Sequence, residues 1–202
     1  LRPHFFALGL EVRSHRRGII RVDDRVTVEI GTPGDVLLLA DLLAPEDQRT
    51  VPGERTFVQQ TDRTARIDAV LPRPGAYLLR LFARPRGQPG PYHWAADYRV
   101  EAAAGDADGG FPVAYDAFGE RDALLVTPLR GTLDAGAPHT FVLRVPGARA
   151  VAVVADDAWR PLTAGRDATF TGQATVPAGE VTVFARFDAD GPYLALVGYT
   201  AR

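Results

Sequence analysis

The chain lacks three residue types on which many kinds of site depend. It has no cysteine among its 202 residues, which excludes a disulfide, a thiolate metal site and a cysteine nucleophile. It has no asparagine, so N-glycosylation is excluded. It has no lysine either, because all 23 basic residues are arginine, and this rules out Schiff-base and P-loop lysine mechanisms. We interpret this usage, with abundant Ala, Gly and Pro, as GC-rich coding of a bacterial type.

Strong charge and long apolar runs are also missing. A net charge of -2 at pH 7 gives no basic footprint, so nucleic-acid binding is not expected. No run approaches the roughly 20 apolar residues of a membrane span, so none is expected. Methionine and a signal-peptide pattern are absent, and we therefore expect a processed or excised region of a protein. The lack of cysteine fits a reducing compartment without identifying one, and localisation stays open.

One sequence pattern occurs twice in the chain, at residues 71–100 and 176–201. Each copy has a corner with proline and glycine, a strand ending in Phe-Ala-Arg, a Gly-Pro-Tyr turn and a final strand with a second tyrosine. From corner to Phe-Ala-Arg the copies differ by two residues, and an even difference keeps each side chain on its own face. Arg17-Gly18 recurs 113 positions later, and Ala40-Asp41 is matched with Ala155-Asp156 at 115. These landmarks predict a duplicated β unit.

Short segments in which apolar and polar residues alternate, separated by turn residues, predict strands throughout the chain. No segment shows a sustained 3.6-residue period with caps, so no long helix is expected. In the last strand of the first copy, Tyr92, Trp94, Ala96, Tyr98 and Val100 are predicted to share the core face. The strands predicted in the first copy cover residues 5–12, 26–30, 36–43, 65–71, 77–84 and 92–100, with surface loops at 44–56 and 85–91.

The resulting fold class is all-β, with two tandem immunoglobulin-like β-sandwich domains related by an internal duplication. Domains are expected at residues 1–103 and 111–202, joined by a small, acidic and flexible linker at 104–110. Gly75-Ala76-Tyr77 is typical of the corner before the sixth strand of such a sandwich, where the tyrosine hydroxyl bonds back to the corner backbone. The second copy has Val181 at that place and should lack the bond.

Several landmarks together carry a family resemblance. They are Phe111–Phe118, Thr127–Gly131, Val145–Ala148, Trp159 and Tyr199 in the second copy, and Ser14-His15 and Leu78–Ala83 in the first. The chain resembles the C-terminal region of the kyphoscoliosis-peptidase and hillarin family of transglutaminase-like proteins.

That resemblance implies tandem immunoglobulin-like domains that follow a papain-like core, to which the catalytic Cys, His and Asp belong. Because this chain has no cysteine and the family's catalytic residues belong to the papain-like core, no catalytic residue of the family is assigned to this chain. The implied role is a non-catalytic accessory region that works with a companion catalytic domain or another protein partner, without a cofactor.

Candidate chemistry in the chain itself is sparse. Ser14-His15 could suggest a hydrolase, but adjacent side chains of an extended segment point to opposite faces, and no G-x-S-x-G elbow is present. The D-A-D-G motifs offer weak calcium candidates at Asp106, Asp108, Asp188 and Asp190. Neither motif supplies the remaining ligands of a calcium loop. The four histidines show no metal-ligand spacing.

Binding is the favoured function, with contacts at strand-end loops. The candidate contact sites are the turn that carries Trp159 and the loop 85–91. A carbohydrate-binding module, with Trp94, Trp159 and several tyrosines as a stacking platform, and an uncharacterised hydrolase remain as alternatives. The candidate binding residues are Trp159, Arg160, Arg84, Arg86 and Arg186, and the structural residues are Tyr77, Phe82, Phe184, Tyr98 and Tyr199.

The corner gives a first testable prediction. Replacing Tyr77 with phenylalanine removes one hydrogen bond and little packing, so the free energy of unfolding should fall by about 1 kcal/mol or somewhat more. Thermal or urea unfolding of the variant and the parent measures this. Equal stability of the two proteins would remove the corner assignment.

Overall fold

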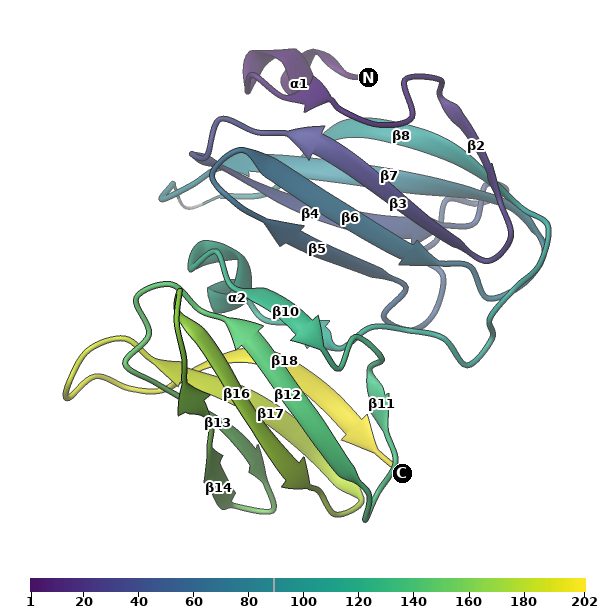
Figure 1. The fold of residues 1–202 in the computed structure, drawn as a ribbon. Helices are drawn as coiled ribbons and strands as arrows, with labels where there is room; N and C mark the ends of the chain where they lie inside the picture. Colours follow the sequence, from purple (N-terminus) through teal and green to yellow (C-terminus); the bar gives the residue numbers. More distant parts are fainter. Residues whose placement is uncertain (89) are drawn as a thin grey trace. The chain divides into compact units, whose positions relative to one another are not determined.

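The computed structural model describes residues 1–88 and 90–202 of the chain. The chain divides into two compact units, Leu1–Gly110 (unit 1) and Phe111–Arg202 (unit 2), and each unit contains two β-sheets (Figure 1). The fold class predicted from the sequence is confirmed: the chain is an all-β tandem of immunoglobulin-like sandwiches. No helix in the described part of the chain is long and apolar enough to cross a membrane.

Unit 1 has the sheet orders β1-β3-β6-β5 and β2-β8-β7-β4. This is the ABED and CFG arrangement of an immunoglobulin-like sandwich, with β2 added in parallel beside β8. A one-turn helix, α1, precedes β1. The bounds are α1 Pro3–Ala7, β1 Glu11–Val12, β2 Ile19–Val22, β3 Arg25–Gly31, β4 Val36–Leu43, β5 Thr56–Gln60, β6 Thr64–Val70, β7 Gly75–Pro85 and β8 His93–Ala102.

Unit 2 repeats this plan, with the orders β10-β12-β16-β15 and β11-β18-β17-β13-β14. Strand β9 also pairs with β18, and β14 extends the second sheet by one edge strand that unit 1 does not show in its described residues. The bounds are β9 Val113–Ala114, α2 Asp116–Glu120, β10 Leu124–Thr127, β11 Thr132–Leu133, β12 Pro138–Arg144, β13 Ala150–Ala155, β14 Ala158–Pro161, β15 Thr163–Ala164, β16 Thr169–Thr175, β17 Gly179–Arg186 and β18 Leu194–Ala201.

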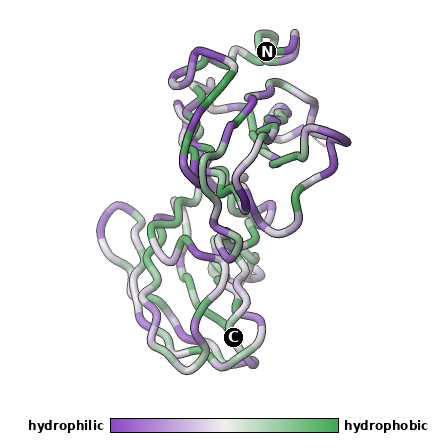
Figure 2. The backbone as a smooth tube through the Cα atoms, turned by 90° about the vertical axis from the view of Figure 1, so that its right-hand side faces the viewer, coloured by the Kyte–Doolittle hydropathy of each residue, from purple (hydrophilic) through white to green (hydrophobic). Residues whose placement is uncertain are grey.

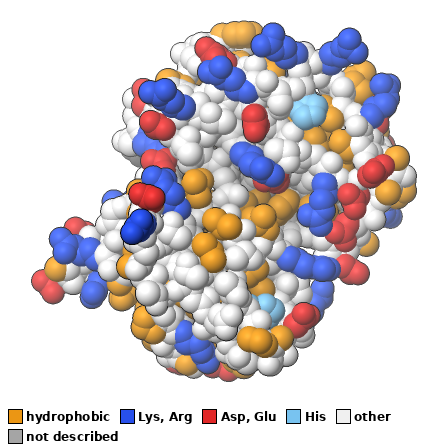
Figure 3. All heavy atoms as spheres, viewed as in Figure 1, with side chains coloured by type: hydrophobic (Ala, Val, Ile, Leu, Met, Phe, Trp, Pro, Cys, Tyr) orange, Lys and Arg blue, Asp and Glu red, His pale blue; other side chains and the backbone are white. Residues whose placement is uncertain are grey.

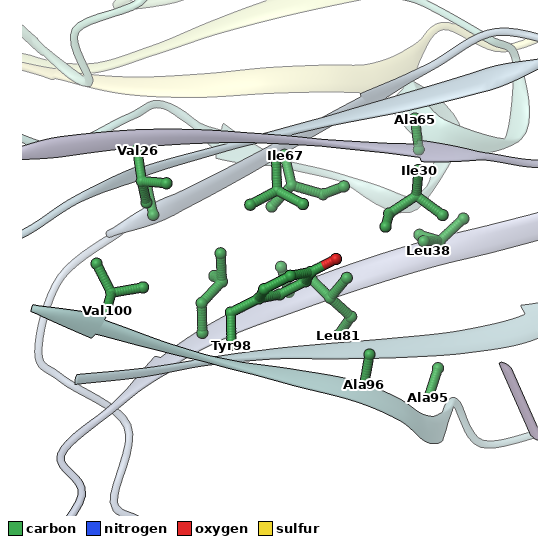
Figure 4. Close-up of a cluster of buried hydrophobic side chains, with 14 of the residues drawn as sticks. Val26, Ile30, Leu38, Ala65, Ile67, Leu81, Ala95, Ala96, Tyr98 and Val100 are labelled. Carbon is green, nitrogen blue, oxygen red and sulfur yellow. The ribbon is translucent and has the colours of Figure 1, made fainter. Parts of the chain in front are cut away.

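The core of each unit forms between its two sheets. Strand positions alternate between buried and exposed, and the hydropathy along the backbone changes repeatedly rather than in long blocks (Figure 2). In unit 1, Ile67 from one sheet and Leu81 from the other are both fully buried, and the ring of Tyr98 lies between the sheets among them (Figure 4). Burial of these alternating apolar side chains is the main favourable contribution to folding.

The open edge of β4 is closed by side chains. The Gln60 carboxamide, only 4% exposed, accepts a hydrogen bond from the Leu38 N–H at 3.0 Å and donates one to the Val36 carbonyl oxygen at 2.8 Å. The Thr56 hydroxyl donates to the Ala40 carbonyl oxygen at 2.6 Å. These bonds satisfy backbone groups that a neighbouring strand would otherwise satisfy.

Strand register relates the two units position by position. Phe82 lies opposite Leu39, and Phe184 lies opposite Ala152, so β4 and β13 are 113 positions apart. The match of Ala40-Asp41 with Ala155-Asp156 at an offset of 115 is therefore wrong. The counterpart of Asp41 is a valine of β13.

The two-residue difference lies instead at the start of β7. Leu79 faces Tyr98, and Val181 faces Tyr199, although Leu79 is four residues past its corner glycine and Val181 only two. Leu79 and Val181 are both fully buried. The expectation that an even difference keeps each side chain on its face is therefore confirmed.

The last strand of each unit contains a β-bulge at the same place. The pairing shifts between Leu81 and Phe82 in unit 1 and between Val183 and Phe184 in unit 2, which leaves Ala95 and Leu196 as the extra residues. A bulge reverses the alternation of faces beyond it. The prediction that Trp94 and Tyr92 share the core face with Ala96 is therefore wrong: both are only partly buried, whereas Ala96 is fully buried.

The extra residue also anchors the segment that enters the unit. The Arg2 N–H donates to the Ala95 carbonyl oxygen at 2.8 Å, and the Tyr115 N–H donates to the Leu196 carbonyl oxygen at 3.0 Å. Each bond positions a one-turn helix whose phenylalanine, Phe5 or Phe118, is 1% exposed.

The predicted strand at residues 5–12 is wrong for this reason. Residues Pro3–Ala7 form α1, and only Glu11–Val12 is a strand. A five-residue helix is too short to show a helical period in the sequence. Tertiary burial of one phenylalanine side chain, rather than local propensity, stabilises it.

Tyrosine hydroxyls distinguish the two units. The Tyr77 hydroxyl donates to the Arg73 carbonyl oxygen at 2.9 Å, the bond expected at the corner. The match of Tyr77 with Val181 is wrong, because register makes Gly179 the counterpart of Tyr77. The Tyr199 hydroxyl donates to the Pro128 carbonyl oxygen at 3.1 Å, whereas the hydroxyl of its counterpart, Tyr98, is buried and has no partner among the described residues. Burial raises the pKa of both phenols, because the phenolate would lose its hydration.

This asymmetry predicts opposite effects of one substitution. Tyr199→Phe should lower the free energy of unfolding by about 1 kcal/mol, because a buried hydrogen bond is lost. Tyr98→Phe should leave stability unchanged or raise it, because it removes a hydroxyl that has no partner. Urea unfolding of both variants tests this. A loss at Tyr98 as large as the loss at Tyr199 would contradict the assignment.

Candidate functional site

The outward face of the β4, β7 and β8 strands carries a cluster of charged and aromatic side chains. The Arg80 guanidinium donates to both carboxylate oxygens of Asp97, at 2.9 and 3.1 Å. The Trp94 indole N–H donates to the same carboxylate at 2.8 Å. The guanidinium carbons of Arg2 and Arg80 lie 3.4 and 4.0 Å from the centre of the Trp94 ring. The sequence analysis missed this cluster, because the bulge that turns Trp94 outward was not foreseen.

Arg80 lies between two carboxylates and binds only one of them. Register places it opposite Asp41 on β4 and opposite Asp97 on β8. Its ion pair is with Asp97. Burial raises the pKa of the Asp41 carboxyl, and the positive charge of Arg80 only partly offsets that rise.

Unit 2 carries an aromatic cluster on the corresponding face, formed by Trp159, Phe184 and Tyr193. The Trp159 ring centre lies 4.7 Å from that of Tyr193 and 5.5 Å from that of Phe184. Trp159 lies on β14, the added edge strand, so its expected place in a turn is wrong, and it is 49% exposed. An exposed tryptophan beside other aromatic rings is a feature that recognition surfaces share.

The repeated Phe-Ala-Arg and Gly-Pro-Tyr motifs form the same contact in both units. The Arg84 guanidinium lies 4.9 Å from the Tyr92 ring centre, and the Arg186 guanidinium lies 5.3 Å from the Tyr193 ring centre. Arg84 also donates to the Gln88 carbonyl oxygen at 2.8 Å. The Nε of Arg186 is buried and has no hydrogen-bond partner within the described residues.

The other two candidate arginines lie elsewhere. Arg160 pairs with Val153 and so occupies the alternate position to Trp159 on β14, where its Nη1 donates weakly to the Ala158 carbonyl oxygen at 3.4 Å. Arg86 donates from Nε to the Gly34 carbonyl oxygen at 3.2 Å. Arg86 belongs to loop 85–91, of which Pro89 lies outside the described residues. Arg84 and Arg86 belong to unit 1 and the remaining three candidates to unit 2.

Ser14 and His15 are closer together than the sequence analysis expected. The Ser14 Oγ lies 3.0 Å from the His15 Nδ1. The reasoning from an extended segment was wrong, because His15 has a left-handed backbone with φ 52°. Ser14 Oγ also accepts a hydrogen bond from the Glu29 N–H at 2.8 Å, which ties the hydroxyl to the turn. Among the described residues no carboxylate is recorded in contact with His15, so a third group that orients the imidazole is not seen.

The acidic candidates for calcium occupy separate places. Asp106 forms an ion pair with Arg25 at 2.8 Å, while Asp188 and Asp190 are exposed in the turn after β17. No group of three or more His, Asp or Glu residues that could hold a metal is found in the described part of the chain. On the face drawn in Figure 3, basic and acidic side chains are interspersed rather than separated by sign.

The segment predicted as a linker is bonded to unit 1. Arg55 donates to the carbonyl oxygens of Asp106, Ala107 and Gly109, and the Asp106 N–H donates to the Leu71 carbonyl oxygen at 2.8 Å. A shallow surface pocket of about 260 Å³ lies beside this segment. It is lined by Val51, Pro52, Arg55, Pro72, Arg73 and Ala107.

Three features define the class of protein, a tandem of immunoglobulin-like domains: the sheet order, the tyrosine corner of unit 1, and the parallel pairing of β2 with β8 and of β11 with β18. The model of the KY-like, immunoglobulin-like domain family matches residues 1–109, more than half of the chain. The chain belongs to that family. The resemblance seen in the sequence is therefore confirmed.

Relatives extend the match beyond unit 1. The chain is 27% identical to human kyphoscoliosis peptidase and 26% identical to the mouse protein, in each case over 203 aligned residues. These matches cover 96% of this chain but only 30% of each peptidase. Solved structures that match include tandem immunoglobulin domains of titin, at 9% identity, TM-score 0.27 and coverage of 96% of this chain and 95% of that one. Another is a neural ectodermal development factor, at 12% identity, TM-score 0.31 and coverage of 95% and 93%.

The competition between the two carboxylates for Arg80 gives a pH-dependent prediction. Because the folded-state pKa of Asp41 is raised, its contribution to stability is fully present below the ordinary pKa of 3.8 and is lost as pH rises through the folded value. Asp41→Asn should therefore raise Tm at pH 7, with a gain that disappears at acidic pH. Asp97→Asn should lower Tm at pH 7, since Arg80 loses its counter-charge and the carboxylate oxygen that accepts its second hydrogen bond. Melting curves across pH test this, and a lower Tm for Asp41→Asn at pH 7 would contradict it.

Proposed function

We propose that this chain is a non-catalytic accessory module that binds a protein partner, and that the partner is a transglutaminase-like catalytic core encoded in the same protein or a companion protein. The observation that carries the proposal is the match of nearly the whole chain to 30% of kyphoscoliosis peptidase. The family model that matches residues 1–109 of this chain is of the immunoglobulin-like type, and such domains present loops and sheet faces from a rigid scaffold.

The geometry of the polar clusters supports a binding role over catalysis. Ser14 and His15 are the nearest approach to a nucleophile and a base, and they lie in an exposed turn rather than in a cleft. Arg80, Asp97 and Trp94 bond to one another, which is typical of a structural cluster. The outward face of unit 2, where Trp159 is exposed, is the contact surface that we propose.

A carbohydrate-binding module remains the second candidate, because a half-exposed tryptophan can stack on a sugar ring. Flat stacking favours coplanar aromatic rings. Trp159 is inclined by 34° to Phe184 and by 60° to Tyr193, so the three rings do not share a plane. We therefore rank protein binding first.

The proposal has a direct test. The reading frame upstream of Leu1 should encode a transglutaminase-like core with Cys, His and Asp, and that core, produced separately, should form a complex with this chain in sedimentation velocity and calorimetry. The chain alone should show no amide hydrolysis or transamidation. An upstream region without such a core, together with sugar binding that Trp159→Ala abolishes, would favour the carbohydrate module instead.

A further inference from the structure

We infer that the outward face of unit 2 at Trp159, Tyr193 and Arg186 binds an acidic, apolar peptide segment of the protein partner, with a carboxylate on Arg186 and an apolar side chain against Trp159. This inference rests on the proposed function and adds the chemistry of the recognised segment. It depends on two features of unit 2 and on one contrast with unit 1. Unit 2 has an arginine without an acceptor among the described residues and an exposed tryptophan beside it, whereas unit 1 supplies the corresponding contacts from its own residues.

The first feature is the state of Arg186. Its guanidinium stacks over Tyr193, its Nε is buried, and no acceptor for its side chain is found among the described residues. The carboxylates of Asp188 and Asp190 follow it in the chain and are exposed. No ion pair between either of them and Arg186 is found in the part of the chain that the structure describes. A partly buried cation without a counter-charge favours an incoming carboxylate, which a guanidinium binds through short, charge-assisted hydrogen bonds.

The second feature is the apolar surface next to this cation. Trp159 and Arg186 both contact the Tyr193 ring, at 4.7 and 5.3 Å. Ala152 faces outward between Pro161 and Phe184, yet it is only 3% exposed. The neighbouring side chains therefore cover a small residue, while Trp159 itself stays 49% exposed. A charge beside an open aromatic ring fits a segment that alternates acidic and apolar residues.

The third feature is the contrast with unit 1. There the equivalent arginine, Arg84, donates to the Gln88 carbonyl oxygen, and the outward tryptophan, Trp94, is covered by Arg2 and bonded to Asp97. Unit 1 thus satisfies its arginine and covers its tryptophan with groups of its own. Unit 2 has the same strand arrangement, but its described residues supply neither an acceptor for Arg186 nor a cover for Trp159. A segment of the protein partner can supply both.

The test uses the full chain and a defined probe, the peptide acetyl-Leu-Glu-Phe-Glu-Leu-amide, with a control peptide in which glutamine replaces both glutamates. In two-dimensional NMR titrations, the acidic peptide should shift the Trp159 indole resonance and amides of β14 and β17. The Trp94 indole should not move. Arg186→Gln should weaken binding about tenfold, the value expected for a charged hydrogen bond, and Trp159→Ala should weaken it as well.

The matched controls separate charge recognition from loss of structure. Arg84→Gln, the same change in unit 1, should leave the affinity unaltered, and Arg186→Glu should bind a peptide with lysine in place of glutamate. Equal binding of the glutamine peptide, or an equal loss with Arg84→Gln, would overturn the inference. Shifts elsewhere on the chain would overturn it too, although complex formation with the catalytic core would still support the proposed function. Binding to neither the peptide nor the core would count against both.

Discussion

The carbonyl oxygen of one extra residue in the last strand determines much of each unit. In unit 1 that residue is Ala95, and in unit 2 it is Leu196. The insertion turns the preceding side chains outward, and its carbonyl oxygen accepts the backbone N–H that positions the entering helix. One bulge therefore links the end of a unit to its beginning, and in unit 1 it turns Trp94 outward.

The two units use this shared frame differently. Unit 1 places Trp94 outward and encloses it with Arg2, Arg80 and Asp97. Unit 2 has Ala195 at the matching position in β18, and its outward tryptophan, Trp159, comes instead from the added strand β14. The two units thus share a scaffold, while their outward faces differ: unit 1 has a self-contained cluster and unit 2 an open aromatic surface.

The sequence predicted the strands in which apolar and polar residues alternate, and the features marked by motifs that occur in both units. The strand at 36–43 and the Tyr77 bond are present as expected, because burial on one face and a corner tyrosine leave a readable pattern. The bulge could not be predicted, since an inserted alanine beside another alanine resembles ordinary strand. The contact between Ser14 and His15 depends on one left-handed residue, which composition does not reveal. The repeated Phe-Ala-Arg motif located Arg186 in the sequence. Whether its side chain finds a hydrogen-bond acceptor depends on residues that are distant in sequence, so the missing acceptor among the described residues could not be predicted.

The carboxamide of Gln60 has a consequence for how such domains remain separate. By bonding to Val36 and Leu38, it fills the place that a foreign strand would take along β4, one of the long apolar strands of the chain. Exposed strand edges of this kind recruit other chains into intermolecular sheets. The buried amide of Gln60 therefore occupies the backbone groups through which β4 could recruit another chain, whereas in unit 2 the corresponding edge is covered by β14.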